Sequence, residues 1–384
     1  MMGRIGKLLF LLLLCASLLI LPVGAEDSSA PATEAVPEEF ISLLEGLPQE
    51  ILELLPEELF STDSEALGNA VAQMSSFPFL LRTCLELLRL RLGNCVGSLA
   101  SVLGILILSS VLRAFGSSLG GEGIGKAFSV CATVAILLSL LKTGYGGFAA
   151  VTSYLDRLEA LTVAAIPLLG TLYALGGNVA AAAASTAGLS VFLSVLQTFV
   201  GKSILPFCGV CLAFSSVNAV DPSLRTGTLL GTLKKNYTTL LAFLMMLLLA
   251  MLSAQTVLGA RSDTLAMRSA KFAASSLIPV VGGSVSELLR SVSASVSYLR
   301  GTVGICAVLL LLMALLPTLI ELLLLRLSWQ IAASVADLLS CDTEKKLLDE
   351  IASLNGYLIA AVSICSSVLF LSLTLLIHCA GALG

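Results

Sequence analysis

Long uncharged runs of apolar residues recur along the chain, separated by short charged segments. A helix needs about 20 mostly apolar residues to cross the hydrocarbon core of a bilayer. The pattern predicts membrane-spanning helices at residues 95–115, 127–147, 180–201, 203–220, 237–259, 301–325 and 357–379. The uncharged stretch from Ala160 to Gly201 is long enough for two spans, or for a re-entrant segment followed by one span. We therefore predict an all-α fold, a polytopic transmembrane helical protein with about seven or eight spans.

The composition of the chain agrees with this pattern. Hydrophobic residues make up 57% of the 384 residues, charged residues make up 12%, and the mean hydropathy is +1.01. So few charged side chains cannot cover the surface of a soluble globule of this length. The composition therefore excludes a soluble globular protein, and the first partner that it predicts is the lipid bilayer.

The first 25 residues have the pattern of a secretory signal peptide. Arg4 and Lys7 precede a long apolar stretch, and the small residues Val23 and Ala25 stand before a cleavage point that follows Ala25. The alternative is an anchor helix that is not cleaved, because the apolar stretch is nearly long enough to span a bilayer. Both interpretations place residue 26 outside the cytoplasm.

Residues 26–92 form an acidic segment that we expect outside the cytoplasm, ahead of a multi-span membrane domain at residues 93–384. The segment carries no Lys or Arg before Arg82. Its phrases VPEE, LPQE and LPEE favour helix starts, because proline suits the first helical position and carboxylates in the first turn favour the helix dipole. The apolar side of these helices would consist of Leu43, Leu44, Leu47, Ile51, Leu54, Leu55 and Leu59. The segment is either an acidic docking element or a solvated, partly disordered spacer.

An Ile-Pro-x-x-Gly motif occurs twice. The first copy, AAIPLLG, contains Pro167 and Gly170, and the second, SSLIPVVGG, contains Pro279, Gly282 and Gly283. Proline removes a backbone donor and glycine permits a turn, so each motif can interrupt a membrane helix. The freed carbonyl groups then need partners from protein or water, because lipid offers none. The motifs mark either re-entrant segments beside a midplane cavity or plain kinks in packed helices.

Other landmarks recur at nearly the spacing of the two motifs. A pair of lysines precedes each of the apolar runs that begin at Tyr237 and Tyr357, and a further proline follows each motif. These landmarks indicate an internal duplication, with repeats at residues 145–259 and 257–380. Duplicated halves with interrupted helices are found in many transporters, whose sites form where the broken helices meet.

Glu321 stands deep in an apolar run, LLPTLIELLLLRL. An ionised side chain at the bilayer centre costs about 2.5 to 3.5 kcal/mol, so such a residue usually faces a partner or a path for solutes. Arg326 is five positions further on and does not share its helix face. Glu321 therefore either lines a midplane cavity with the two motifs or lies near the membrane interface.

Few residues have the character or the spacing of a catalytic, cofactor-binding or metal site. Cys208 and Cys211 form a CGVC motif inside an apolar span, where cysteines are expected as small buried hydrophobic residues. His378, the single histidine, cannot build a multi-histidine metal site. The sequence contains no phosphate-binding loop, and its aromatic residues lie mostly within spans. We expect no enzyme activity, no catalytic residues, no cofactor, no metal and no nucleic acid partner.

Loop charge leaves the topology open around residues 260–300. Five basic residues against two acidic ones favour a cytoplasmic position for this loop, whereas strict alternation of the predicted spans places it outside. One re-entrant segment would change the parity of the spans.

The densest family likeness lies in the block ARSDTLAMRSAKFAASSLIPVVGGSVSELLRSVSASVSYLRGTVG, Ala260 to Gly304, and in RLSWQIAASVADLLSC, Arg326 to Cys341. Together with the signal peptide, the acidic segment and the final span, these blocks resemble the stage III sporulation protein AE family of endospore-forming bacteria. The likeness covers most of the chain from about residue 40 onward, and it is least specific in the leucine-rich spans.

The resemblance implies a multi-pass cell-membrane protein in the mother-cell membrane that surrounds the forespore. It implies a subunit of a channel-like, secretion-like complex needed for late forespore development. The expected partners are the other stage III A sporulation proteins, including a cytoplasmic ATPase and ring-forming subunits. The resemblance brings no catalytic residues with it. The alternative is a small-solute permease, with a site formed by two broken helices and Glu321.

Overall fold

The computed structural model describes residues 44, 47–60, 64–118, 122–175, 179–220, 227–247, 250 and 282–381. Within these ranges the chain is helical and contains no β-strand, so the predicted all-α class is confirmed. The elements are α3 (Gln49–Leu52), the 3₁₀ turn η1 (Glu57–Phe60), α4 (Ser64–Ser75), α5 (Phe77–Ser118), α6 (Glu122–Leu175), α7 (Val179–Val220), a helix at 227–247, α9 (Gly282–Leu338) and α10 (Asp342–Gly381).

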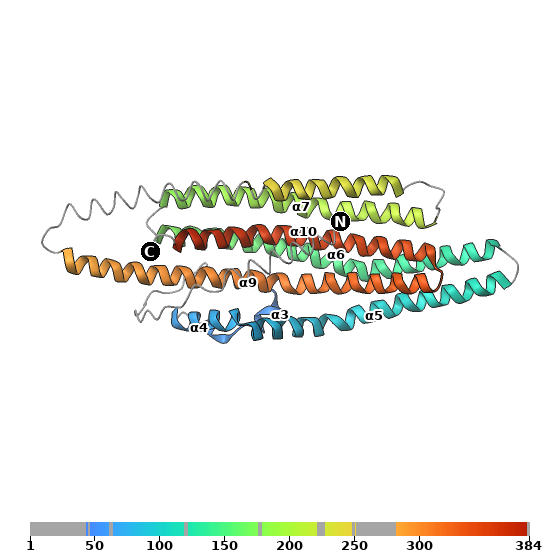
Figure 1. The fold of residues 1–384 in the computed structure, drawn as a ribbon, viewed down its shortest axis with the longest axis horizontal. Helices are drawn as coiled ribbons and strands as arrows, with labels where there is room; N and C mark the ends of the chain where they lie inside the picture. The colour runs from blue at the N-terminus through green and yellow to red at the C-terminus, as the bar shows by residue number, and fades with distance from the viewer. Residues whose placement is uncertain are drawn as a thin grey trace.

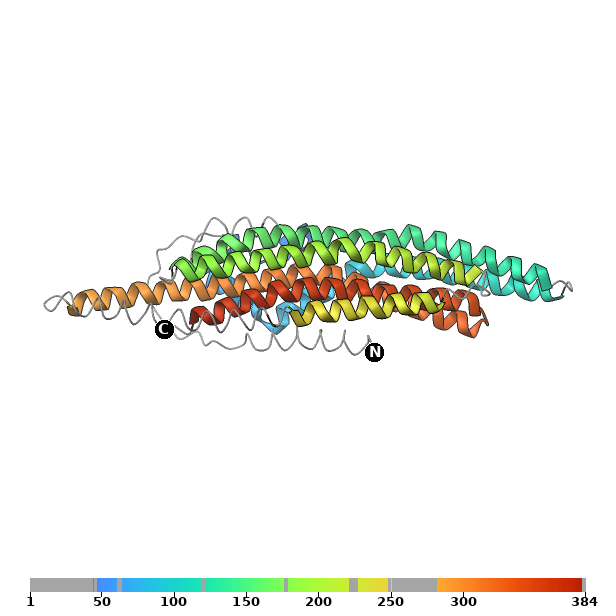
Figure 2. The ribbon, with the colours of Figure 1, turned by 90° about the horizontal axis from the view of Figure 1, so that it is seen from above.

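The long helices lie side by side along one axis and form an elongated bundle (Figures 1 and 2). α9 and α10 make the most extensive contact, and α5, α6 and α7 pack around them. α9 has 57 residues, which at about 1.5 Å per residue gives a length of about 85 Å. A bilayer's hydrocarbon core is only about 30 Å thick, so the helix extends well beyond it.

Four helical stretches in the described ranges are long and apolar enough to cross a membrane: Phe77–Phe115, Gln197–Asn218, Thr302–Leu338 and Asp342–Ser367. Each overlaps a span predicted from the sequence. The spans predicted at 127–147 and 180–201 fall inside the longer helices α6 and α7. The total of seven or eight spans stays a prediction, because the span predicted at 237–259 lies only partly within the described ranges.

The four candidate spans differ in how far the protein itself covers them. In α9 and α10, 72% of the most apolar window is buried, compared with 22% in α5. The outer side of α5 exposes a row of large apolar side chains: Leu81, Leu85, Leu90, Leu92, Val96, Ile107, Leu108, Val111 and Phe115. α9 and α10 therefore supply the centre of the bundle, whereas α5 presents an apolar surface outward. The four long apolar helices and the apolar outer surface of α5 indicate a membrane protein.

Residues of the acidic segment belong to the same core as the long helices. Leu47, Ile51 and Leu59 are buried in one continuous cluster with residues of α6, α9 and α10. α3 begins directly after Pro48 and η1 directly after Pro56, so two of the three predicted proline-led helix starts are confirmed. The third, at VPEE, lies outside the described residues, as does the predicted signal peptide.

The predicted boundary between residues 92 and 93 falls inside the uninterrupted helix α5. The segment before it also packs into the bundle, so the structure gives no visible break there. The division of the chain into a signal peptide, an acidic segment and a membrane domain stays a prediction.

The first Ile-Pro-x-x-Gly motif does not interrupt its helix, since α6 runs through positions 167 and 170. Of the second motif, Pro279 lies outside the described residues, and Gly282 and Gly283 are the first two residues of α9. α6 is therefore continuous at Pro167, without the re-entrant turn that was one of the two interpretations; the kink stays a prediction.

A tight turn joins α9 to α10. Ser340 adopts a left-handed backbone conformation with φ 55°, the one positive value among non-glycine residues of the described chain. The Cys341 N–H donates to the carbonyl of Ala336 at 2.8 Å, and the Ser340 N–H donates to that of Asp337 at 3.0 Å. This pair of bonds is the Schellman motif, which ends one helix and turns the chain back at once. It makes α9 and α10 antiparallel neighbours.

Candidate functional site

Glu321 lines a cavity of about 330 Å³ between α3, α5, α6 and α9. The walls are built from Pro48, Glu50, Arg91, Ala149, Ala150, Ser153, Tyr154, Arg157, Leu161, Ala314, Pro317, Thr318 and Glu321. Four of these side chains carry charge in an otherwise apolar bundle. Glu321 is among these lining residues, while the predicted midplane site that it would share with the two motifs stays a prediction. Whether Pro167, Gly170, Pro279, Gly282 and Gly283 take part in a site stays a prediction, because their side-chain surroundings lie outside what the structure describes.

Arg91 of α5 is the partner that Glu321 required. Its Nη1 atom lies 3.4 Å from Oε2 of Glu321, while its Nη2 atom donates to both carboxylate oxygens of Glu50 at 2.8 and 3.0 Å. One guanidinium therefore joins two carboxylates, one from the acidic segment and one from α9. This arrangement compensates the charge of Glu321, whose side chain is only 19% exposed.

The sequence does not single out Arg91 and Glu50 as cavity residues. Glu50 could have been suspected because it follows Pro48 in the first turn of α3, next to the buried Ile51. Arg91 gave no comparable signal, because the residues that it binds lie 41 and 230 positions away in the sequence. Only the packing of the helices reveals the pairing.

Proline also shapes the cavity, but not through the predicted motifs. Pro317 lies inside α9, in the cavity wall between Ala314 and Glu321. It has no N–H to donate to the carbonyl of residue 313 one turn earlier. The carbonyl of Met313 therefore lacks its usual helical donor, one turn before Pro317 and the hydroxyl-bearing Thr318 of the cavity wall.

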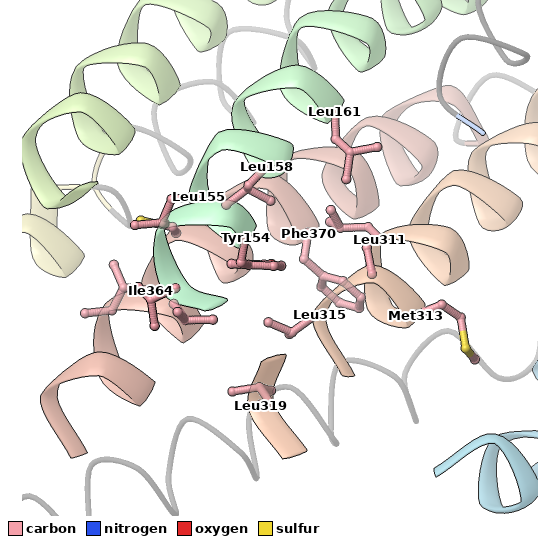
Figure 3. Packing of buried hydrophobic residues seen from close by; sticks show 14 of the residues in the cluster. Tyr154, Leu155, Leu158, Leu161, Leu311, Met313, Leu315, Leu319, Ile364 and Phe370 are labelled. Carbon is pink, nitrogen blue, oxygen red and sulfur yellow. The ribbon is translucent and has the colours of Figure 1, made fainter. Parts of the chain in front are cut away.

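One side of the cavity is anchored by Tyr154 of α6. Its hydroxyl forms a buried hydrogen bond with the Ser366 hydroxyl of α10. The Tyr154 ring lies among apolar side chains that include Leu158, Leu315 and Phe370 (Figure 3). Such close packing holds the ring in place, so this wall of the cavity is preformed.

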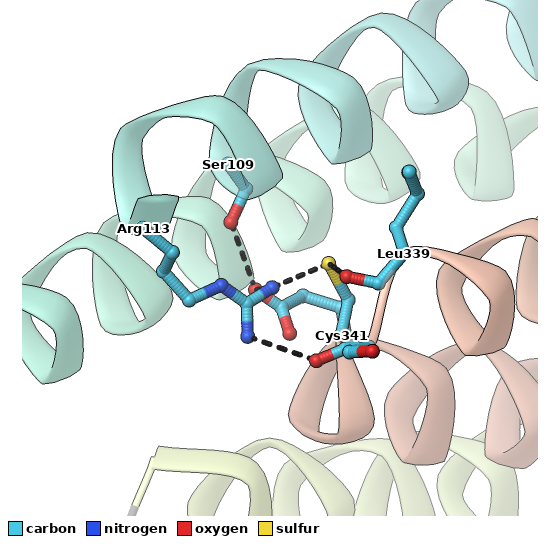
Figure 4. A network of polar contacts seen from close by, with 6 residues as sticks. Ser109, Arg113, Leu339 and Cys341 are labelled. Atoms are coloured by element: carbon cyan, nitrogen blue, oxygen red, sulfur yellow. Dashed lines mark hydrogen bonds and ion pairs between the residues drawn. The ribbon is translucent and has the colours of Figure 1, made fainter. Parts of the chain in front are cut away.

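A second polar network lies where α10 begins. Arg113 of α5 contacts Oε1 of Glu344 at 3.3 Å, and Ser109 donates to the same oxygen at 3.1 Å (Figure 4). Arg113 also contacts Sγ of Cys341 and, at 3.5 Å, the carbonyl of Ser340. Glu344 is fully buried and stands in the first turn of its helix, where a carboxylate is favoured by the helix dipole.

The two networks are 22 positions apart on α5, and no charged residue lies between Arg91 and Arg113. At about 1.5 Å per residue this separation is about 33 Å, close to the thickness of the hydrocarbon core. The spacing fits a membrane-embedded segment with a charged cluster at each end.

A third contact joins α7, the helix at 227–247 and α10. Lys234 pairs with Glu350, and the rings of Phe207 and Tyr237 stack with centroids 3.9 Å apart. Tyr357 meets Tyr237 edge-on at 6.2 Å, so two landmarks of the predicted duplication touch each other. The duplication itself stays a prediction.

Cys208 and Cys211, both buried free thiols of α7, lie in the largest apolar cluster. Within the ranges that the structure describes, no group of three or more His, Cys, Asp or Glu side chains is placed to hold a metal ion. The candidate site itself offers two arginines, two carboxylates and the hydroxyl groups of Ser153, Tyr154 and Thr318.

The family model described as Stage III sporulation protein AE matches residues 68–380, which include α5 to α9, α10 except its last residue, and both arginine networks except Glu50. The chain belongs to the stage III sporulation protein AE family. A curated relative, Stage III sporulation protein AE of Bacillus subtilis (strain 168), is 26% identical over 281 residues, which cover 72% of this chain and 70% of the relative. No solved structure matches. Membership of the stage III sporulation protein AE family gives the chain a role in stage III of sporulation, as the resemblance predicted.

Proposed function

We propose that the chain is a non-enzymatic membrane subunit of a channel-like complex that connects the mother cell with the forespore. It resides in the mother-cell membrane around the forespore and acts in late forespore development. Its partners are the other stage III A sporulation proteins, among them an ATPase and ring-forming subunits. The observation that carries the proposal is the family match, which extends over residues 68–380.

The shape of the bundle supports a subunit of a larger assembly. α6 has 54 residues and α9 has 57, so both are far longer than the roughly 20 residues that cross a bilayer. The parts outside the hydrocarbon core can contact proteins on the membrane surface. The exposed apolar side of α5 suits lipid or the span of another subunit, where helices associate by close packing.

The test is deletion of the gene in the spore-forming host that encodes this chain. We expect engulfment to finish, late forespore gene expression to stop, and heat-resistant spores to fall to background. Affinity purification of the tagged chain from cells in this stage should recover the ATPase and the ring-forming subunits. A normal spore yield after deletion would refute the role in development. Purification without either kind of partner would refute membership of the complex.

A second candidate function is a small-solute permease, and the charged cavity favours it. A permease would move a solute across liposomes that contain only this chain. A conduit subunit would show no such transport without its partners. Measuring solute uptake with the chain alone and with the assembled complex separates the two.

A further inference from the structure

We propose that the cavity between α3, α5, α6 and α9 binds a small zwitterionic solute of the amino-acid type. Arg157 takes the anionic group of the solute, and Glu321 takes its ammonium group. This inference concerns binding by the chain itself, so its failure would leave membership of the sporulation complex untouched.

The Glu321 carboxylate can accept further hydrogen bonds beside its contact with Arg91. Arg91 donates two hydrogen bonds to Glu50, but it meets Glu321 only at an ion-pair distance of 3.4 Å. The Glu321 carboxylate has two oxygens and accepts several hydrogen bonds when ionised. Arg91 therefore leaves acceptor positions of the Glu321 carboxylate open, and an ammonium group can bind to the remaining oxygen.

Arg157 supplies the opposite charge from α6, on another wall of the same cavity. Its side chain is exposed, and it makes no ion pair with any residue that the structure describes. A guanidinium in this situation binds a carboxylate or a phosphate through two parallel N–H donors.

The remaining walls suit a small ligand. Ala149, Ala150 and Ala314 leave room, while Ser153 and Thr318 offer hydroxyl groups. The volume of about 330 Å³ is near the lower end of the range of small-molecule sites, which is about 300–1,000 Å³. A ligand of amino-acid size fits this volume better than a drug-sized molecule.

The formal charge of the cavity-lining residues favours a zwitterionic ligand over a ligand with a net charge. Two arginines and two glutamates line the cavity, so its formal charge is zero. A net anion or cation would leave one charge uncompensated beside the largely buried Glu321–Arg91 pair, which is costly. A zwitterion brings one group for Glu321 and one for Arg157, and the balance is kept.

Two sources can supply this pair of charges. A free amino acid carries an ammonium and a carboxylate. The headgroup of phosphatidylethanolamine carries an ammonium and a phosphate. The recognition is the same in both cases, so the test must include lipid composition as a variable.

The experiment uses the purified full chain in nanodiscs of phosphatidylglycerol, titrated calorimetrically with glycine, alanine, glutamine and leucine. Isopentylamine and 4-methylpentanoate serve as leucine analogues that each lack one charge. We expect at least one amino acid to bind. We also expect each single-charge analogue to bind about tenfold more weakly than leucine or not at all, because a hydrogen bond to a charged group is lost. Absence of binding by all four amino acids, or equal binding by the analogues, would overturn the proposal.

Substitutions of the two proposed ligand-binding residues test whether the ligand binds in this cavity. Arg157→Gln and Glu321→Gln should each weaken amino-acid binding about tenfold or more. Arg89→Gln is the matched control, because Arg89 is exposed on α5 and does not line the cavity. Arg157 is also exposed, so its variant should fold even if Glu321→Gln does not. Unchanged binding by Arg157→Gln would refute the assignment.

The lipid arm repeats the titration in nanodiscs that contain phosphatidylethanolamine. Unchanged binding of the amino acid identifies the free solute as the occupant. Loss of binding, with the lipid competing for the site, identifies the headgroup as the occupant. Arg157→Gln must abolish amino-acid binding in the first case and competition by the lipid in the second. Binding or competition that survives this substitution contradicts the site.

Discussion

Arg113 of α5 contacts the fully buried carboxylate of Glu344 in the first turn of α10, with Nη2 and Oε1 3.3 Å apart. The contact joins helices whose paired residues are 231 positions apart in the sequence. Ser109 donates to the same oxygen, so the carboxylate is held by two residues of α5. This pair fixes the start of α10 against α5 at the turn that follows α9.

Arg113→Met should destabilise the protein strongly. It removes the guanidinium that contacts the buried Glu344 carboxylate, and breaking a buried pair in this way costs about 3–5 kcal/mol. Denaturant unfolding in detergent, followed by circular dichroism, measures the loss. Arg89→Met is the control, because Arg89 is exposed and should change stability little. Equal effects of the two substitutions would show that the Arg113 pair does not stabilise the fold.

Arg91 and Glu321 should be energetically coupled. Arg91→Met leaves Glu321 without its positive partner, so adding Glu321→Gln to this variant should restore part of the lost stability. A double-mutant cycle of unfolding free energies should give a coupling of about 0.5–3 kcal/mol. Additive effects of the two substitutions would contradict a direct ion pair.

Two glycines should respond to alanine with opposite signs. A Cβ on Gly147 would lie 3.1 Å from Cδ1 of the buried Leu325, whereas a Cβ on Gly209 would meet no atom within 4 Å. Overpacking costs about 1–3 kcal/mol, and replacing glycine by alanine in a helix gains up to about 1 kcal/mol. Gly147→Ala should therefore lower the thermal midpoint and Gly209→Ala should raise it. The same sign for both would show that the Leu325 side chain moves aside freely.

Stability should fall in alkaline solution in a way that depends on Cys341. Burial raises the pKa of the Cys341 thiol above its ordinary value of 9.0, and the nearby Arg113 only partly opposes this shift. A group whose folded-state pKa is raised contributes stability below its unfolded pKa and loses it as the pH rises through the folded value. The unfolding free energy of the wild type should thus decline above pH 9.0 more steeply than that of Cys341→Ala. Parallel curves from pH 7 to pH 10 would exclude this contribution.

Part of the fold is predictable from the sequence because it depends on interactions between residues close together in the chain. Pro48 and Pro56 stand directly before their helical turns, one position ahead of the first helical residue, and the spacing of Leu47, Ile51 and Leu55 gives the buried side. These signals lie within a few residues of the structures that they predict. The same holds for the apolar spans, whose helical character follows from length and composition.

The candidate site was predictable only through Glu321. A lone carboxylate in an apolar run predicts a partner, but it does not say which of the 21 basic residues that partner is. The arginine that pairs with it is set by how α5 packs against α9, which involves tertiary contacts across the whole chain. Pro167 failed as a sign of a broken helix because proline can remain inside a membrane helix when neighbouring groups satisfy the freed carbonyl.

The two arginine networks also have a mechanical consequence. Arg91 of α5 pairs with Glu321 of α9, and Arg113 of α5 contacts the carbonyl of Ser340 in the turn directly after α9. If α5 moved along α9 by one helical turn, about 5.4 Å, both contacts would break together. The two contacts therefore hold α5 and α9 in one register along their length, and we expect the two helices to tilt together.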